Sequence, residues 1–287
     1  MYQGINVDPI NPLGRPDPDQ LFCMGFGWVR MVSRPGAEEY AASCRRLGLR
    51  VLAVVARESG GYLMAEADAI EAGNEEDAQG AASSWGMTPE EYSAMWTDTL
   101  YGAGGRPVIV GGLASGVPSI GEPYLQMPAA SGFGLHPYGK TPEEARSLIQ
   151  GYRALTRLPV WVTEWNRPAA EMVEFSRMMR EEGVAGAFWF CWSDGMVGGF
   201  GLDEPGKLEA MMSVLVDAAS DLESRISKLE AMVMLLQQQG SMRDNVLVQV
   251  LQGNWSGFPS AEATLKALMG GDANPENATW SALTFPK

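Results

Sequence analysis

Eight short apolar runs recur along the first 219 residues, and they constrain the fold more than any other feature of the sequence. They lie at residues 4–7, 26–32, 49–56, 67–72, 107–112, 132–138, 158–164 and 184–192. Buried strands of a parallel sheet read as short, almost continuous apolar runs. Helix signals lie between several of them, so strands and helices alternate over about 220 residues. The pattern predicts the α/β class, as a (β/α)₈ TIM barrel over residues 1–219.

Two of the predicted helices begin with the same four residues. The sequence Thr-Pro-Glu-Glu occurs at 88–91 and again at 141–144. Threonine suits the N-cap, proline suits the first helical position, and acidic residues in the first turn complement the helix dipole. Further helices are expected at residues 38–47, 172–182 and 208–219.

Composition excludes several classes of function. At 287 residues the chain can bury a sizeable core, but its net charge of −14 argues against a nucleic-acid partner. With one histidine and three scattered cysteines, the sequence predicts no metal site and no cofactor. No apolar window reaches the roughly 20 residues that a membrane span needs. Residues 1–6 carry no signal-peptide pattern, so a cytoplasmic location is the default expectation.

Two of the apolar runs end in an acidic residue. Glu75 follows Gly73-Asn74, and Glu164 closes the run that begins at Val160. A carboxylate in such a place is costly unless the strand end opens onto a polar pocket, and the carboxyl ends of the strands carry the active site of a barrel. Two carboxyl groups are the minimum equipment for hydrolysing a glycosidic bond, as acid/base and as nucleophile or second base.

Several segments resemble the retaining glycoside hydrolases of the (β/α)₈ superfamily, such as cellulases, mannanases and β-xylosidases. Residues 74–75, 84–85 and 88–92 resemble the region of their fourth strand. The resemblance extends over residues 4–219. Residues 135–138, 163–165 and 188–192 are similar to the ends of the sixth, seventh and eighth strands of these enzymes, in that order. Residues 201–203 are similar to the segment before their last helix. The sequence departs from the family at 76–77, where Glu-Asp replaces a common proline.

The resemblance implies a role for each residue of the predicted site. Glu75 is the general acid/base and Glu164 the nucleophile. Asn74 binds the sugar 2-hydroxyl, and Arg30 keeps Glu164 ionised, because a nearby cation lowers a carboxyl pKa. The implied substrate is an oligo- or polysaccharide.

Other candidate residues keep two readings. His136, the single histidine, either orients the site or is a structural residue; Tyr138 either hydrogen-bonds the nucleophile or packs. Trp85, Trp165 and Trp189 either stack on sugar rings or belong to the core. The acids Glu58, Glu71 and Asp194 near strand ends could bind substrate hydroxyls, but solvated loop acids are the simpler interpretation.

The chain changes character after the predicted barrel. Leu222, Ile226, Leu229, Val233 and Leu236 are spaced as a short heptad seam. Residues 220–240 are therefore expected to form either a coiled coil, through which two copies could associate, or a helix packed on the barrel. Residues 241–287 form a small C-terminal segment that is short for a core of its own.

The tail and the barrel together leave a second function open. A barrel hydrolase with a short heptad and no signal peptide is similar to phage proteins of the virion or tail, which would be virion-associated or released by lysis. The alternative to an enzyme is a catalytically degenerate barrel that binds carbohydrate or serves in phage assembly. A binding module needs neither acid at a strand end, and this sequence has both.

Overall fold

Eight parallel strands close into a barrel in the computed structural model, which describes residues 1–56, 61–78 and 86–220. Each strand pairs with the next in sequence, and β1 pairs with β8 to close the ring. The strands are β1 (Tyr2–Asn6), β2 (Trp28–Val32), β3 (Arg50–Val55), β4 (Ala69–Asn74), β5 (Val108–Leu113), β6 (Phe133–Leu135), β7 (Val160–Trp165) and β8 (Gly186–Trp189). The predicted (β/α)₈ barrel is confirmed.

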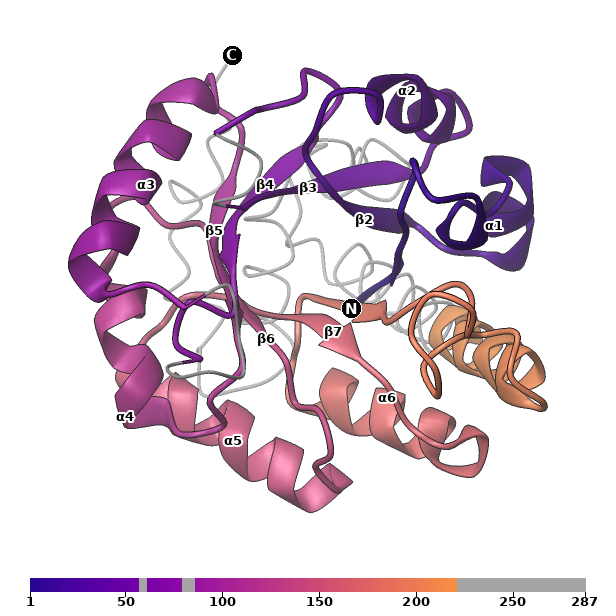
Figure 1. Cartoon of the computed structure of the whole chain (residues 1–287). Helices are drawn as coiled ribbons and strands as arrows, with labels where there is room; N and C mark the ends of the chain where they lie inside the picture. Colours follow the sequence, from indigo (N-terminus) through magenta and orange to yellow (C-terminus); the bar gives the residue numbers. More distant parts are fainter. Residues whose placement is uncertain (57–60, 79–85, 221–287) are drawn as a thin grey trace, which may run out of the picture. The chain divides into compact units, whose positions relative to one another are not determined.

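Helices surround the ring of strands on its outside (Figure 1). They are α1 (Pro18–Met24), α2 (Glu38–Arg46), α3 (Pro89–Gly102), α4 (Pro118–Gly121), α5 (Pro142–Leu155) and α6 (Met172–Glu181), with short 3₁₀ turns η1 (Pro12–Gly14), η3 (Glu122–Gln126) and η4 (Ala169–Glu171). Residues 207–220 are also helical. Both Thr-Pro-Glu-Glu segments form complete capping boxes, at the starts of α3 and α5.

The inside of the barrel is filled in two layers along the strands. The lower layer is apolar: Trp28 of β2 contacts Trp161 of β7 and Phe188 of β8, although β2 is hydrogen-bonded to neither β7 nor β8. One step further along β2, the inward side chain is Arg30, and one step along β4 it is Glu71. Tight packing of the lower layer closes the amino-terminal end, so the polar layer faces the other end of the barrel.

Some elements differ from the sequence prediction. The turn-rich stretch after the first strand contains η1 and α1, and the connection between β5 and β6 contains α4 and η3, none of which the apolar pattern indicates. Short helices of this kind lack the repeated apolar face from which longer ones are recognised. The predicted heptad at 222–236 and the segment 241–287 lie outside the described residues. In the part of the chain described, no helix is long and apolar enough to span a membrane.

Candidate active site

Arg30 connects the residues at the carboxyl end of the barrel. Its Nε donates to Glu71, its Nη1 lies 2.6 Å from Oε1 of Glu164 and 2.7 Å from Oδ1 of Asn6, and its Nη2 lies 2.7 Å from Oδ1 of Asn74. Burial would lower the pKa of the guanidinium, but the carboxylates of Glu71 and Glu164 raise it. A buried charge is stable only when it is paired and hydrogen-bonded, and Arg30 meets both conditions.

Glu164 is held as a carboxylate. Its side chain is 10% exposed, and burial alone would raise its pKa. His136 and Arg30 outweigh burial, and the Tyr138 hydroxyl adds a hydrogen bond of 2.8 Å to Oε2, so the pKa of Glu164 lies below its usual value. In the structure, therefore, both Arg30 and Tyr138 contact Glu164; their roles in the site stay predictions.

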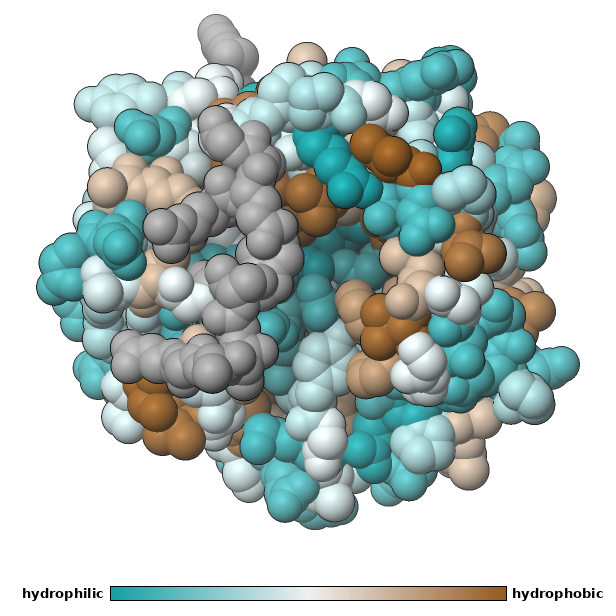
Figure 2. Space-filling view, in the orientation of Figure 1, coloured by the Kyte–Doolittle hydropathy of each residue, from teal (hydrophilic) through white to brown (hydrophobic). Residues whose placement is uncertain are grey.

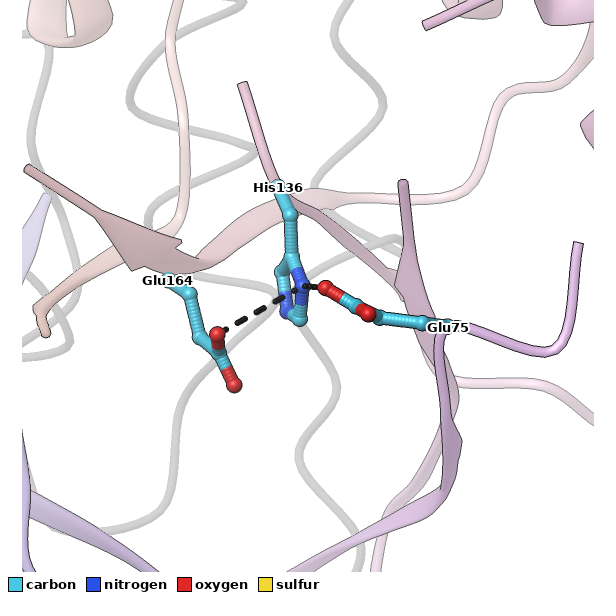
Figure 3. Close-up of side chains that lie close together, drawn as sticks. All are labelled: Glu75, His136 and Glu164. Atoms are coloured by element: carbon cyan, nitrogen blue, oxygen red, sulfur yellow. Dashed lines mark hydrogen bonds and ion pairs between the residues drawn. The ribbon is translucent and has the colours of Figure 1, made fainter. Parts of the chain in front are cut away.

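Glu75 meets Glu164 through His136 (Figure 3). Nδ1 of the buried imidazole lies 3.0 Å from Oε1 of Glu75 and 3.7 Å from Oε2 of Glu164. Nε2 lies 3.1 Å from the Thr163 hydroxyl, which fixes the plane of the ring. One ligand atom from each of Glu75, His136 and Glu164 lies within 4.8 Å of the other two. Of the two readings of His136, the structure supports contact with the site.

The backbone turns sharply at Glu75. Its φ is 58°, in the left-handed region that residues other than glycine rarely adopt. The peptide N–H of Glu75 donates to the carbonyl of Gly112 at 2.9 Å, and its own carbonyl accepts from Ala78 at 3.0 Å. These bonds hold the strained turn at the end of β4, where the side chain of Glu75 reaches His136. Strain of this kind is concentrated at functional sites.

A cavity of about 420 Å³ lies over these groups. Glu75, Glu164 and Asn74 line it together with three aromatic rings, those of Tyr138, Phe190 and Phe200. Figure 2 shows a hollow near the centre of this face, with hydrophilic residues in its depth and hydrophobic residues on its rim. The site therefore combines a polar floor with apolar walls, as small-molecule sites do.

The predicted tryptophans are not on these walls. Trp165 and Trp189 are 1% and 0% exposed and pack edge to face, with ring centroids 4.9 Å apart. Trp165 stacks on Phe175 of α6, and neither tryptophan lines the cavity. Of the two interpretations of these rings, the structure therefore supports packing in the core. Trp85 lies outside the described residues.

Three buried acids were not expected from the sequence. Glu71, interpreted as a solvated acid, is fully buried and paired with Arg30. Glu76 and Asp77, which stand where the family commonly has proline, are each 1% exposed. Asp77 accepts the N–H groups of Ala114 and Ser115 and so ties the end of β4 to the loop after β5. The position of Glu71 inside a predicted strand could have indicated that it is buried, but only if Arg30 on β2 had been recognised as its partner.

Glu75, His136 and Glu164 have the spacing of a three-residue metal site as well. Two of their neighbours oppose that use. The guanidinium of Arg30 lies 2.6 Å from Glu164 and repels a second cation, and Tyr138 occupies the other oxygen of that carboxylate. The arrangement suits carboxyl chemistry better than coordination.

Solved structures share this fold at low sequence identity. A GH5_18 glycoside hydrolase from Bifidobacterium longum in complex with Manb1-4GlcNAc is 15% identical, with a TM-score of 0.57, and the match covers 78% of this chain and 79% of that one. A GH128 oligosaccharide-binding protein from Trichoderma gamsii is also 15% identical, with a TM-score of 0.55 and coverage of 76% and 95%.

A third structure shows how far this likeness extends. A 3-deoxy-D-arabino-heptulosonate 7-phosphate synthase from Thermotoga maritima is 14% identical, with a TM-score of 0.50 and coverage of 78% and 87%. No protein-family model matches the sequence, and a comparison with curated proteins gives no match. The likeness establishes the barrel, and the activity has to be argued from the site.

Proposed function

We propose that this protein is a retaining glycoside hydrolase in which Glu75 is the acid/base and Glu164 the nucleophile. The observation that carries the proposal is that one carboxyl oxygen of Glu75 lies within 4.8 Å of one carboxyl oxygen of Glu164 at one end of the barrel. Retaining enzymes hold their carboxyl groups about 5–5.5 Å apart, whereas inverting enzymes leave about 6.5–9.5 Å for a water molecule. The glycoside hydrolases among the structural neighbours support the same reaction class.

The geometry supports this division of roles between the two acids. Glu164 is ionised because Arg30 and Tyr138 donate to it and lower its pKa, as a nucleophile requires. In the first step a Glu164 oxygen bonds to the anomeric carbon, the glycosidic bond breaks, and the leaving oxygen takes a proton from Glu75. In the second step Glu75 removes a proton from water, whose oxygen bonds to the anomeric carbon and releases Glu164.

Two further side chains position these groups. His136 holds Glu75 from one ring nitrogen while its other nitrogen contacts Thr163, so Glu75 keeps a fixed direction. Asn74 accepts a hydrogen bond from Arg30 at its Oδ1, and among the described residues its Nδ2 has no hydrogen-bond partner. That free amide lines the cavity and can donate to the sugar 2-hydroxyl, a bond that strengthens in the transition state.

A carbohydrate-binding barrel without activity is the second candidate. One structural neighbour is an oligosaccharide-binding protein by its own description. Binding alone would not require a strained turn at Glu75 or a carboxylate held by both an arginine and a tyrosine. Those features favour the enzyme.

The test is hydrolysis of a panel of aryl β-glycosides and polysaccharides by the wild type, Glu75→Gln and Glu164→Gln. Glu181→Gln is the matched control, because Glu181 is an exposed acid paired with Arg146 on the outer helices. We expect activity in the wild type and the control, and a loss of several orders of magnitude in both site variants. Equal activity in all four proteins would remove the two acids from the mechanism; glycan binding without turnover would favour the binding barrel.

A further inference from the structure

The cavity has an ion pair on the wall beyond the two catalytic carboxyls. Asp8 lies two residues after β1 and Arg34 two residues after β2, and the guanidinium of Arg34 donates to Oδ1 of Asp8. Both line the same cavity as Glu75 and Glu164. Their side chains are 27% and 37% exposed, so they are accessible from the cavity.

The position of this pair identifies the part of the substrate that it faces. Glu75 at the end of β4 protonates the leaving oxygen, so the leaving group lies on the β4 side of Glu164. Asp8 and Arg34 follow β1 and β2, which are reached around the ring from β7, the strand of Glu164, through β8, whereas β4 is reached in the other direction through β6 and β5. The sugar that becomes attached to Glu164, the glycone, therefore points toward Asp8 and Arg34.

The pair has unused hydrogen-bonding capacity on both partners. Oδ1 of Asp8 accepts the N–H groups of Ile10 and Asn11 at 3.1 and 3.2 Å as well as Arg34. Its Oδ2 and the Nη1 of Arg34 have no hydrogen-bond partner among the described residues. An acceptor fixed beside a donor matches the two functions of a sugar hydroxyl.

The charges of the cavity favour an uncharged ligand. Arg30 and Arg34 are its two lining arginines, and each is already paired with a carboxylate: Arg30 with Glu164, Arg34 with Asp8. With Glu75, which has no arginine partner, the charged residues that line the cavity in the described part of the chain are three acids and two bases. A sugar carboxylate would lose its hydration here and find no unpaired arginine among the lining residues, which makes its binding unfavourable.

We propose that Asp8 and Arg34 bind hydroxyl groups of the glycone and select a neutral sugar over the corresponding uronate. The inference rests on the proposed hydrolase function for its direction, since that function places the glycone on this wall. The carboxylate of Asp8 supplies the discrimination, because it neutralises Arg34 and repels a second carboxylate.

The test compares wild type with Asp8→Asn on matched pairs of aryl glycosides and aryl uronides, such as β-glucoside and β-glucuronide, which differ at C6. Asparagine keeps the Oδ1 that accepts from Ile10 and Asn11, so the turn is preserved and only the charge is lost. We expect the ratio of kcat/KM, neutral over uronate, to fall by at least about tenfold, with a raised KM for the neutral sugar. Asp217→Asn is the control, because Asp217 also pairs with arginines but does not line this cavity.

Binding separates this inference from the hydrolase proposal. Calorimetry with methyl β-glycosides and methyl β-uronides needs no turnover, and Arg34→Gln provides a second variant if Asp8→Asn does not fold. A neutral preference in wild type that Asp8→Asn reduces supports the role of the pair even if no glycoside is hydrolysed. Hydrolysis of uronides as fast as of neutral glycosides, or an unchanged preference in both variants, overturns it.

Discussion

At the scale of single residues, one arginine makes the site workable. Without Arg30, Glu71 and Glu164 would be buried acids deprived of their cationic partner, an arrangement that is costly in a protein interior. With it, Glu164 is ionised and aligned by bonds from two directions, from β2 and from Tyr138. The same contacts that stabilise the polar layer therefore prepare the proposed nucleophile.

Tyr138→Phe should weaken the nucleophile without disturbing packing, because only the hydroxyl is lost. Removing the 2.8 Å bond to Oε2 raises the pKa of Glu164, so the acid limb of the pH profile of kcat/KM should move to higher pH. We expect kcat to fall about tenfold to a hundredfold. A pH profile of both proteins checks this, and an unchanged acid limb would contradict the role of Tyr138.

The pKa of Glu76 is shifted in the opposite direction to that of Glu164, so Glu76 should make the stability of the protein depend on pH. Burial, and then the charges of Glu71 and Asp77, raise its pKa well above the usual value, and its Oε2 is buried without a partner. A raised folded-state pKa means that the stability contributed by Glu76 is complete below its unfolded pKa of about 4.5 and is lost as pH rises. Glu76→Gln should therefore stabilise the protein at pH 7 and have little effect at pH 4.

Denaturant unfolding of the wild type and Glu76→Gln at both pH values measures this difference in the free energy of unfolding. Glu181→Gln, at an exposed position, controls for the loss of one negative charge from the molecule. Destabilisation by Glu76→Gln at pH 7 would show that the carboxyl is ionised in the folded state.

At the scale of elements, β5 and β6 have glycines at positions where a side chain would overlap the site. Gly112 of β5 faces His136, and an added Cβ would overlap the imidazole ring. Gly134 of β6 faces the interior, where an added Cβ would lie 2.9 Å from Oε1 of Glu71 and 2.7 Å from the Thr163 hydroxyl. Neighbouring side chains approach the backbone at these two positions so closely that only glycine fits, and the polar layer depends on both glycines.

Gly112→Ala should displace His136 and release Glu75. Overpacking at such a site costs about 1–3 kcal/mol of stability, and loss of the bond between His136 and Glu75 should lower kcat at least about tenfold. Gly27→Ala is the matched control, since the nearest atom to an added Cβ there is 3.9 Å away. Thermal unfolding and steady-state kinetics of both variants test the expectation, which fails if the two alanine variants behave alike.

Sequence patterns predicted the elements that repeat and missed contacts that depend on closure. The strands were recognisable because parallel strands buried on both faces are apolar throughout, and Glu75 and Glu164 stood out as acids at their ends. Glu71 did not, because its partner Arg30 lies two strands away on β2, and the two side chains meet only inside the curved barrel. Asp8 and Arg34 lie in loops, where no periodicity marks them.

At the scale of the whole barrel, stability and chemistry occupy different ends. Aromatic rings of β2, β7 and β8 close the amino-terminal half, and side chains of β2, β4 and β7 that contact one another as ion pairs fill the carboxyl-terminal half. An apolar layer beneath the charges lowers the local dielectric and strengthens the pairing of Arg30 with its two carboxylates. The barrel thus serves as a rigid support for side chains that would otherwise be too costly to bury.

The most direct test of the account is the trapping of the glycosyl-enzyme intermediate. The wild type would be incubated with an activated 2-deoxy-2-fluoro glycoside of the sugar that the panel identifies, then digested and mapped by mass spectrometry. The account predicts one adduct of a single sugar on Glu164, absent in Glu164→Gln and still formed in Glu75→Gln. Turnover of the parent glycoside with no adduct, or an adduct on another residue, would contradict Glu164 as the nucleophile.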